Sequence, residues 1–179
     1  MVVRHQDEWP VLLQMVRGGL NSPMASSAGR LFDAVSALLD LGDVNAYEGQ
    51  GAMKLEAAAS PQWTGYPWAL RASSPLIVDP LPMIGRIADD VTSGVARDVI
   101  AGRFHNTVAD MLGALAKGVS SERGIEWVAL SGGSFQNALL LEAVVARLRA
   151  DGLRPLVHRQ VPCNDGGLSL GQAVVAGMG

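Results

Sequence analysis

A loop in the last third of the chain carries the strongest pattern for ligand binding. Residues 130–137 read LSGGSFQN and lie between a predicted strand and a predicted helix. Gly132 and Gly133 would let a ligand approach the backbone, and the helix after them offers free N–H groups and the positive end of its dipole. A tight turn with Ser134 as N-cap and nothing bound explains the run as well, because it matches neither a Walker loop nor the GxGxxG spacing.

A second loop, residues 162–167, follows the next predicted strand and opens the last predicted helix. Because parallel strands end at one edge of a sheet, both loops should leave that edge together. The carboxylate of Asp165, followed by two glycines, could ligate a divalent cation with little steric hindrance. The alternative is that Asp165 or Asn164 only caps the helix.

Asp33 is a third candidate, because an acidic residue is unusual beside the apolar Phe32 and Val35 of a predicted helix. Gly29 lies one turn earlier on the same face and would clear space above the carboxylate. Together they could admit a sugar whose hydroxyls donate to Asp33. A surface-exposed Asp33 beside a close helix crossing at Gly29 explains the same pattern.

Histidine and cysteine spacing provides no local metal site. The three histidines are scattered, and none has a second histidine three or four residues away. We interpret His105 as a buried helix-packing residue with a satisfied ring nitrogen. Cys163, the single cysteine, is interpreted as a small buried residue rather than a nucleophile.

Three helices are predicted over residues 8–59, and the second of them positions Asp33. The first runs from Trp9 to the glycine pair 18–19, which ends helices well. The serine pair 26–27 offers an N-cap for the second, and the third covers residues 48–59.

Strand and helix signals then alternate. Residues 62–82 predict a β-hairpin or two short strands, and residues 82–118 return to helix with an interruption near Gly94 or Gly102. The inward face of that helical stretch is predicted to comprise Val99, Phe104, Val108, Met111, Leu112 and Leu115.

The last third predicts a βαβα unit on a parallel sheet, which would place both loops. Its predicted strands are residues 127–130 and 155–158, and its predicted helices are residues 139–148 and 168–178.

Composition limits the class of protein. The chain has 179 residues, 49% of them hydrophobic, which is ample apolar surface for a packed core. A net charge of -3 argues against binding nucleic acid through its phosphates. We expect a soluble cytoplasmic protein, because no apolar run reaches the about 18 residues of a membrane span and one cysteine cannot form an internal disulfide.

Six blocks of the chain together resemble the C-terminal end of the hydrogenase maturation carbamoyltransferases, the HypF family. They occur in the family's order across nearly the whole sequence. The blocks are residues 21–23, 26–35, 47–53, 103–106, 130–137 and 161–172.

The resemblance implies a fold and an activity. The last domain of this family is similar to the threonylcarbamoyl-transferring (Kae1-like, TsaD-like) proteins, with the two-lobed actin and Hsp70-like (ASKHA) nucleotide fold. We therefore expect an α/β, helix-rich C-terminal lobe over residues 1–179, with its N-terminal lobe absent. The family uses ATP and carbamoyl phosphate to make carbamoyl-adenylate and passes the carbamoyl group to the C-terminal cysteine of a HypE-like partner. That group later becomes a cyanide ligand of the nickel-iron centre.

By position, the resemblance also implies site residues. Gly29 and Asp33 match the helix that lines the ribose, Gly132, Gly133 and Asn137 match the adenine-side glycine loop, and Asp165 matches the aspartate that completes a divalent metal site (Mg, Fe or Zn). The family's paired metal histidines lie in the other lobe, so the metal site implied here is incomplete.

Two hypotheses follow. The first is the nucleotide-binding lobe of a carbamoyltransferase, which alone lacks full activity. The second is a non-catalytic binding or interaction module that retains the fold. A lobe without its mate exposes apolar surface, so self-association is expected in either case.

Overall fold

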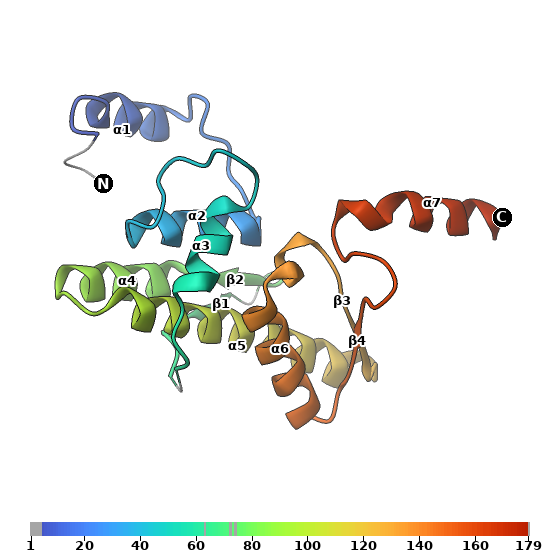
Figure 1. Cartoon of the computed structure of the whole chain (residues 1–179). Helices are drawn as coiled ribbons and strands as arrows, with labels where there is room; N and C mark the ends of the chain where they lie inside the picture. Colours follow the sequence, from blue (N-terminus) through green and yellow to red (C-terminus); the bar gives the residue numbers. More distant parts are fainter. Residues whose placement is uncertain (1–4, 63, 72, 74, 179) are drawn as a thin grey trace. The chain divides into compact units, whose positions relative to one another are not determined.

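The computed structural model describes residues 5–62, 64–71, 73 and 75–178. The chain divides into two compact units, Met1–Leu55 and Glu56–Gly179. Both are helix-rich, and the second also contains two small sheets (Figure 1).

The first unit contains the three predicted helices. They are α1 (Trp9–Gly18), α2 (Ala28–Leu38) and α3 (Gln50–Ala58), the last of which runs on into the second unit. The left-handed conformation of Gly19 ends α1, and the hydroxyl of Ser27 caps α2 by accepting from the N–H of Arg30 at 3.4 Å. The helix prediction is confirmed, although α1 buries none of its residues.

The second unit begins with the predicted hairpin. Strands β1 (Ala69–Arg71) and β2 (Ile77–Asp79) pair antiparallel, which confirms that prediction. Helices α4 (Leu81–Thr92) and α5 (Arg97–Arg123) follow, and the chain turns between them at Gly94, whose φ is +74°. The predicted interruption near Gly94 is therefore confirmed. The alternative interruption near Gly102 is wrong, because Gly102 lies inside α5.

Gly102 serves close packing instead. A Cβ atom at this position would lie 2.0 Å from the carbonyl oxygen of Ser60 and 2.7 Å from Cγ of Gln62. Two hydrogen bonds join the segment after α3 to α5: the N–H of Ser60 donates to the backbone carbonyl oxygen of Asp98, and the N–H of Tyr66 donates to the hydroxyl of Thr107. The absence of a side chain at Gly102 lets this segment cross the helix.

The last third forms the predicted parallel unit. Strand β3 (Trp127–Leu130) pairs with β4 (Arg154–Val157) in parallel, with α6 (Ala138–Ala150) between them in sequence and α7 (Leu168–Gly177) after them. Short 3-10 turns, η1 (Gly133–Gln136) and η2 (Asp165–Gly167), precede α6 and α7. The βαβα prediction is confirmed, and Figure 1 shows α6 lying against α5.

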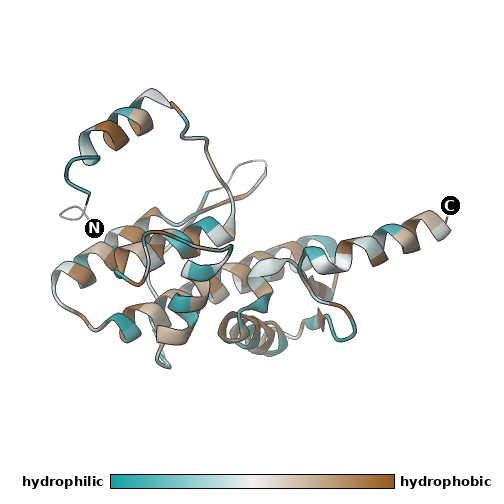
Figure 2. Cartoon of the chain, turned by 45° about the horizontal axis from the view of Figure 1, so that its top comes forward, coloured by the Kyte–Doolittle hydropathy of each residue, from teal (hydrophilic) through white to brown (hydrophobic). Residues whose placement is uncertain are grey.

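Helices α5 and α6 supply much of the core of the second unit. On the predicted inward face of α5, Phe104, Val108 and Met111 are buried, whereas Val99, Leu112 and Leu115 are half-buried. By contrast, α7 buries none of its residues, and Figure 2 shows hydrophobic residues along it up to the C-terminus. Among the described residues, no helix combines the length and the apolar character needed to cross a bilayer.

Candidate functional site

The two predicted ligand loops meet at the carboxyl end of the β3–β4 sheet. The backbone N–H of Gly132 donates to the carbonyl oxygen of Cys163 at 2.7 Å, which joins the glycine loop (residues 130–137) to the carboxylate loop (residues 162–167). Parallel pairing of Leu130 with Val157 brings the two strand ends to the same edge. The prediction that both loops leave one edge of the sheet is therefore confirmed.

Gly132 adopts a backbone conformation that favours glycine. Its φ is +106°, and a Cβ atom at Gly132 or at Gly133 would meet no other atom within 4 Å. The space beside both residues is open, so their backbone is accessible to a flat or polar ligand. A residue with a Cβ atom at Gly132 would carry backbone strain, even though the Cβ itself would clash with nothing.

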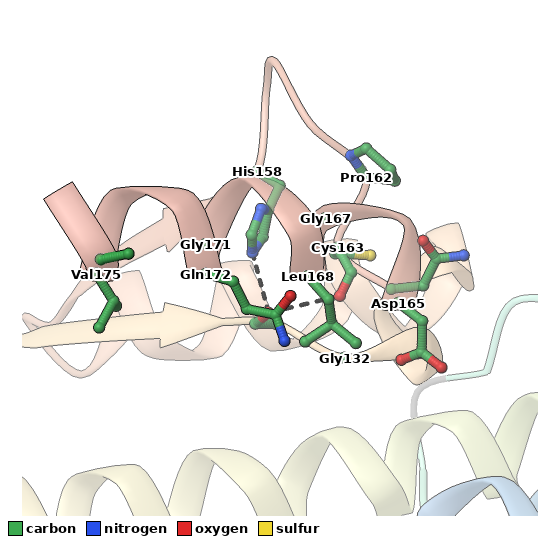
Figure 3. A pocket seen from close by; sticks show the side chains of 13 residues that line it. Gly132, His158, Pro162, Cys163, Asp165, Gly167, Leu168, Gly171, Gln172 and Val175 are labelled. Atoms are coloured by element: carbon green, nitrogen blue, oxygen red, sulfur yellow. Dashed lines mark hydrogen bonds between the residues drawn. The ribbon is translucent and has the colours of Figure 1, made fainter.

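A cavity of about 660 Å³ opens beside the two loops. Figure 3 shows His158, which directly follows β4, together with residues of the carboxylate loop and of α7 around it. The lining residues are Ser131, Gly132, His158, Pro162, Cys163, Asn164, Asp165, Gly167, Leu168, Gly171, Gln172, Val175 and Ala176.

Ser131 and His158 form a polar pair in this cavity that sequence reasoning missed. Nε2 of His158 lies 3.0 Å from the hydroxyl of Ser131, which also lies 3.5 Å from the carbonyl oxygen of Cys163 (Figure 3). Because the two residues are 27 positions apart, no local motif signals the pair. The strand register of β3 and β4, once known, would have suggested it.

Asp165, in the carboxylate loop, is exposed and lines the cavity. Asn164 caps the 3-10 turn η2, because its side-chain oxygen accepts from the N–H of Gly166 at 3.1 Å. Neither Asn164 nor Asp165 caps α7, whose N-cap is Gly167 without a side-chain hydrogen bond, so the capping alternative is wrong for that helix. Cys163 is half-buried. Among the described residues, no group of three histidine, cysteine or acidic side chains is close enough to hold a metal ion.

The N-terminus of α6 is already occupied by side chains of the protein. The carboxylate of Glu56 accepts from the N–H of Ala138 at 2.7 Å, and the amide oxygen of Asn137 accepts from the N–H of Leu140 at 2.9 Å. This corrects two expectations, because the N-cap is Asn137 rather than Ser134 and these N–H groups are not free. A ligand at the glycine loop therefore meets the Gly132–Gly133 backbone rather than these two N–H groups.

Asn137, the last residue of the glycine loop, is buried and contacts His105. Its Nδ2 lies 2.9 Å from Nε2 of His105, whose Nδ1 lies 2.8 Å from the carbonyl oxygen of Ala101. Burial lowers the pKa of His105, more than its bond to Ala101 and the charge of Glu56 raise it. The prediction that His105 packs in the core with a satisfied ring nitrogen is confirmed.

In the first unit, Asp33 is half-buried and held by its neighbours. Its carboxylate accepts from Asn45 at 3.1 Å and from Arg30 at 3.4 Å. The glycine that makes room for it is Gly51, where a Cβ atom would lie 2.8 Å from the carboxylate. Gly29 does not have this role and marks no close helix crossing, because a Cβ there would meet only the hydroxyl of Ser27, at 3.6 Å.

The predicted site residues thus fall into three groups. Gly132, Gly133 and Asp165 belong to the joined loops, and Asn137 is buried where the glycine loop enters α6. Gly29 and Asp33 lie in the first unit.

Comparison with protein families gives a match over residues 1–172. The matching family model is described as "Carbamoyltransferase, Kae1-like Domain, second subdomain".

Relatives of known name and structure agree with this match. The chain is 38% identical to the carbamoyltransferase HypF of Synechocystis sp. and 39% identical to that of Rhodobacter capsulatus, covering 84% and 91% of its own length. It spans 19% and 21% of these relatives. A crystal structure of full-length HypF in its phosphate- and nucleotide-bound form superposes with a TM-score of 0.91 at 38% identity, over 95% of this chain and 23% of that one. The HypF structure from T. kodakarensis gives a TM-score of 0.83 at 29% identity, over 96% and 22%.

Proposed function

The chain belongs to the HypF carbamoyltransferase family, and we propose that it is the nucleotide-binding C-terminal lobe of the Kae1-like transferase domain. In this proposal the lobe has the ASKHA fold and helps pass a carbamoyl group from carbamoyl-adenylate to the C-terminal cysteine of a HypE-like partner during nickel-iron hydrogenase maturation. The observation that carries the proposal is the junction of the two loops beside an open cavity.

A solved relative supports the choice of ligand. The HypF structure that superposes over 95% of this chain is of a phosphate- and nucleotide-bound form. The open backbone at Gly132 and Gly133 suits the flat face of an adenine, because no Cβ atom stands between the ligand and the peptide planes.

Asp33 is proposed to bind the ribose, with Gly29 beside it. Its carboxylate is held in place by Asn45 and Arg30 and has lone pairs left over, since a carboxylate has about four acceptor sites. A sugar hydroxyl that donates to Asp33 would therefore meet a group of fixed orientation, which lowers the entropic cost of binding.

We propose that Asp165 is one ligand of a divalent metal ion whose other ligands come from outside the described residues. The described residues contribute one carboxylate, Asp165, and no group of three ligands, so they do not form a metal site by themselves. No step of the transfer is assigned to a metal on this lobe.

The proposed reaction is an acyl transfer. A bond forms between the partner's cysteine sulfur and the carbamoyl carbon, the bond from that carbon to the phosphate oxygen breaks, and AMP leaves with the bonding pair while the thiol proton passes to solvent or a base. This lobe would hold the adenosine portion still, which makes the attack effectively unimolecular within the assembled domain.

Titration calorimetry with ADP tests the proposal on the 179-residue chain. We expect weak binding that Asp33→Ala reduces, whereas Asp7→Ala, at an exposed acidic position in the same unit, leaves binding unchanged. If the chain binds no ADP at millimolar concentration but retains a HypE-like partner, it is instead a non-catalytic interaction module.

A further inference from the structure

A directional chain of hydrogen bonds runs from α5 to the N-terminus of α6 through His105 and Asn137. The carbonyl oxygen of Ala101 can only accept, so Nδ1 of His105 carries the hydrogen, at 2.8 Å. The N–H of Leu140 can only donate, so the oxygen of the Asn137 amide faces it, at 2.9 Å. The Asn137 nitrogen is thereby turned to Nε2 of His105, at 2.9 Å.

These constraints fix the state of the imidazole. Nε2 must present its lone pair to the N–H of Asn137, which leaves His105 neutral with its hydrogen on Nδ1. Protonation would set two donors, the ring N–H and the Asn137 amide, against each other. The direction in which burial moves the pKa of His105 agrees with this state.

Burial makes the chain of bonds costly to break. His105 is 4% exposed and Asn137 is 8% exposed, so neither group can replace a lost partner with bulk water. Asn137 is also the last residue of the glycine loop, and its backbone N–H donates to the carbonyl oxygen of Ser134 in the turn above. Whatever orients the Asn137 side chain therefore acts on the turn that follows Gly132 and Gly133.

We propose that His105 is a positioning residue that holds the glycine loop in place through Asn137. His105 does not line the cavity, and neither does Asn137. The role in ligand binding rests on the proposed function, whereas the role in ordering the loop does not. The ligand class is the one proposed above, an adenosine nucleotide bound against the Gly132–Gly133 backbone.

Two substitutions at His105 separate this role from simple core filling. His105→Phe fills the space and removes the acceptor, so the Asn137 amide loses its partner. His105→Gln restores an acceptor near the position of Nε2 and should rescue. Ile87→Val, in the buried face of α4, is the control for a mild loss of stability that does not touch the chain of bonds.

Amide hydrogen exchange and ADP titration are measured on the full chain. In His105→Phe we expect exchange at Leu140 to accelerate about tenfold and ADP affinity to fall by a similar factor, the equivalent of one buried hydrogen bond. His105→Gln should stay near the unsubstituted chain on both measures, and Ile87→Val should leave ADP affinity unchanged.

The outcomes separate the two proposals. If His105→Phe and Ile87→Val affect Leu140 exchange and ADP affinity equally, or if His105→Gln does not rescue, His105 is only a core residue and the inference is wrong. If the unsubstituted chain binds no ADP, the proposed function fails, while exchange at Leu140 still decides whether His105 orders the loop.

Discussion

Gly102 shows how one missing side chain permits a whole segment to pack. The carbonyl group of Ser60 crosses α5 at Gly102, and a Cβ atom at Gly102 would lie only 2.0 Å from its oxygen. One turn further along the same face of α5, Asn106 donates to the carbonyl oxygens of Gln62 and Thr64. The glycine and the asparagine together fix the path of the segment that leads from α3 to the hairpin.

The first prediction concerns this glycine. Gly102→Ala should lower the free energy of unfolding by about 1–3 kcal/mol or more, because backbone rather than a flexible side chain would have to move. Gly118→Ala, in the same helix with nothing within 4 Å, should instead raise it by roughly 0.5–1 kcal/mol through helix propensity. Urea denaturation of both variants checks the contrast, and equal effects would contradict it.

The second prediction concerns pH and the two histidines with shifted pKa values. Burial places the pKa of His105 below 6.5, so the unfolded chain binds more protons just below that pH. The stability that neutral His105 contributes is therefore present above pH 6.5 and lost as the pH falls through the folded-state value. His5 acts in the opposite sense, because its bonds to Asp43 and Glu8 raise its pKa.

Urea midpoints in a His5→Gln background isolate the contribution of His105. Between about pH 7.5 and pH 5.5 the midpoint should fall, and adding His105→Gln should flatten that fall. An unchanged slope in the double variant would assign the pH dependence to other groups.

At the scale of elements, α6 is held near both ends by hydrogen bonds to residues that are distant in sequence. Glu56 reaches Ala138 across 82 positions, and Arg147 at the other end of α6 bonds to Asp110 and to Asn106 on α5. The carboxylate of Glu56 also opposes the positive end of the helix dipole. Helix α6 is thus anchored near both ends.

The third prediction tests the anchor at the N-terminus of α6. Glu56→Ala should cost about 0.5–2 kcal/mol of stability, because the N–H of Ala138 loses its acceptor and the dipole its counter-charge. Glu142→Ala, an exposed acidic position in the same helix, should change stability by less than about 0.5 kcal/mol. Thermal unfolding compares the two, and equal shifts in Tm would refute the assignment.

The order and type of the elements could be predicted from the sequence because their signals are local. Apolar spacing marks α2 and α6, glycines mark the end of α1 and the turn before α5, and the parallel pairing of β3 and β4 follows from the intervening helix. The convergence of the glycine loop with Asp165 follows from the same topology.

The contacts that tune the site could not be predicted, because they depend on which segments pack together. Asn45 and Gly51 become partners of Asp33 only after the turn between α2 and α3 folds back. Ser134 has a side chain that is common at N-caps, but it lies in the 3-10 turn η1. The N-cap of α6 is therefore Asn137. Gly102 gives a break signal that tertiary packing overrides.

At the scale of the whole molecule, the chain spans about a fifth of the relatives named above. The fourth prediction is that the purified chain shows no carbamoyl phosphate-dependent ATP cleavage above background, because the proposed lobe holds adenosine without supplying the adenylate-forming chemistry. A release assay for pyrophosphate or phosphate checks this. Turnover at rates typical of an enzyme would contradict this prediction.

The fifth prediction concerns exposed apolar surface. On α7, Leu170 is 51% exposed and Val174 is 52% exposed, one turn apart on one face. We expect concentration-dependent self-association in sedimentation velocity, reduced by the pair Leu170→Ser and Val174→Ser. Val119→Ser, at an exposed position on α5, is the matched control and should have no effect. A monomer at all concentrations would contradict the expectation.

The shortest bond at the junction of the two loops joins main-chain atoms, since the N–H of Gly132 donates to the carbonyl oxygen of Cys163 at 2.7 Å, and the hydroxyl of Ser131 lies 3.5 Å from the same oxygen. The thiol of Cys163 takes no part in that bond, although the residue borders the cavity. The bond that joins the two loops therefore does not depend on the side chain at position 163. Substitution there offers a way to alter which ligand is preferred without rebuilding the scaffold beneath it.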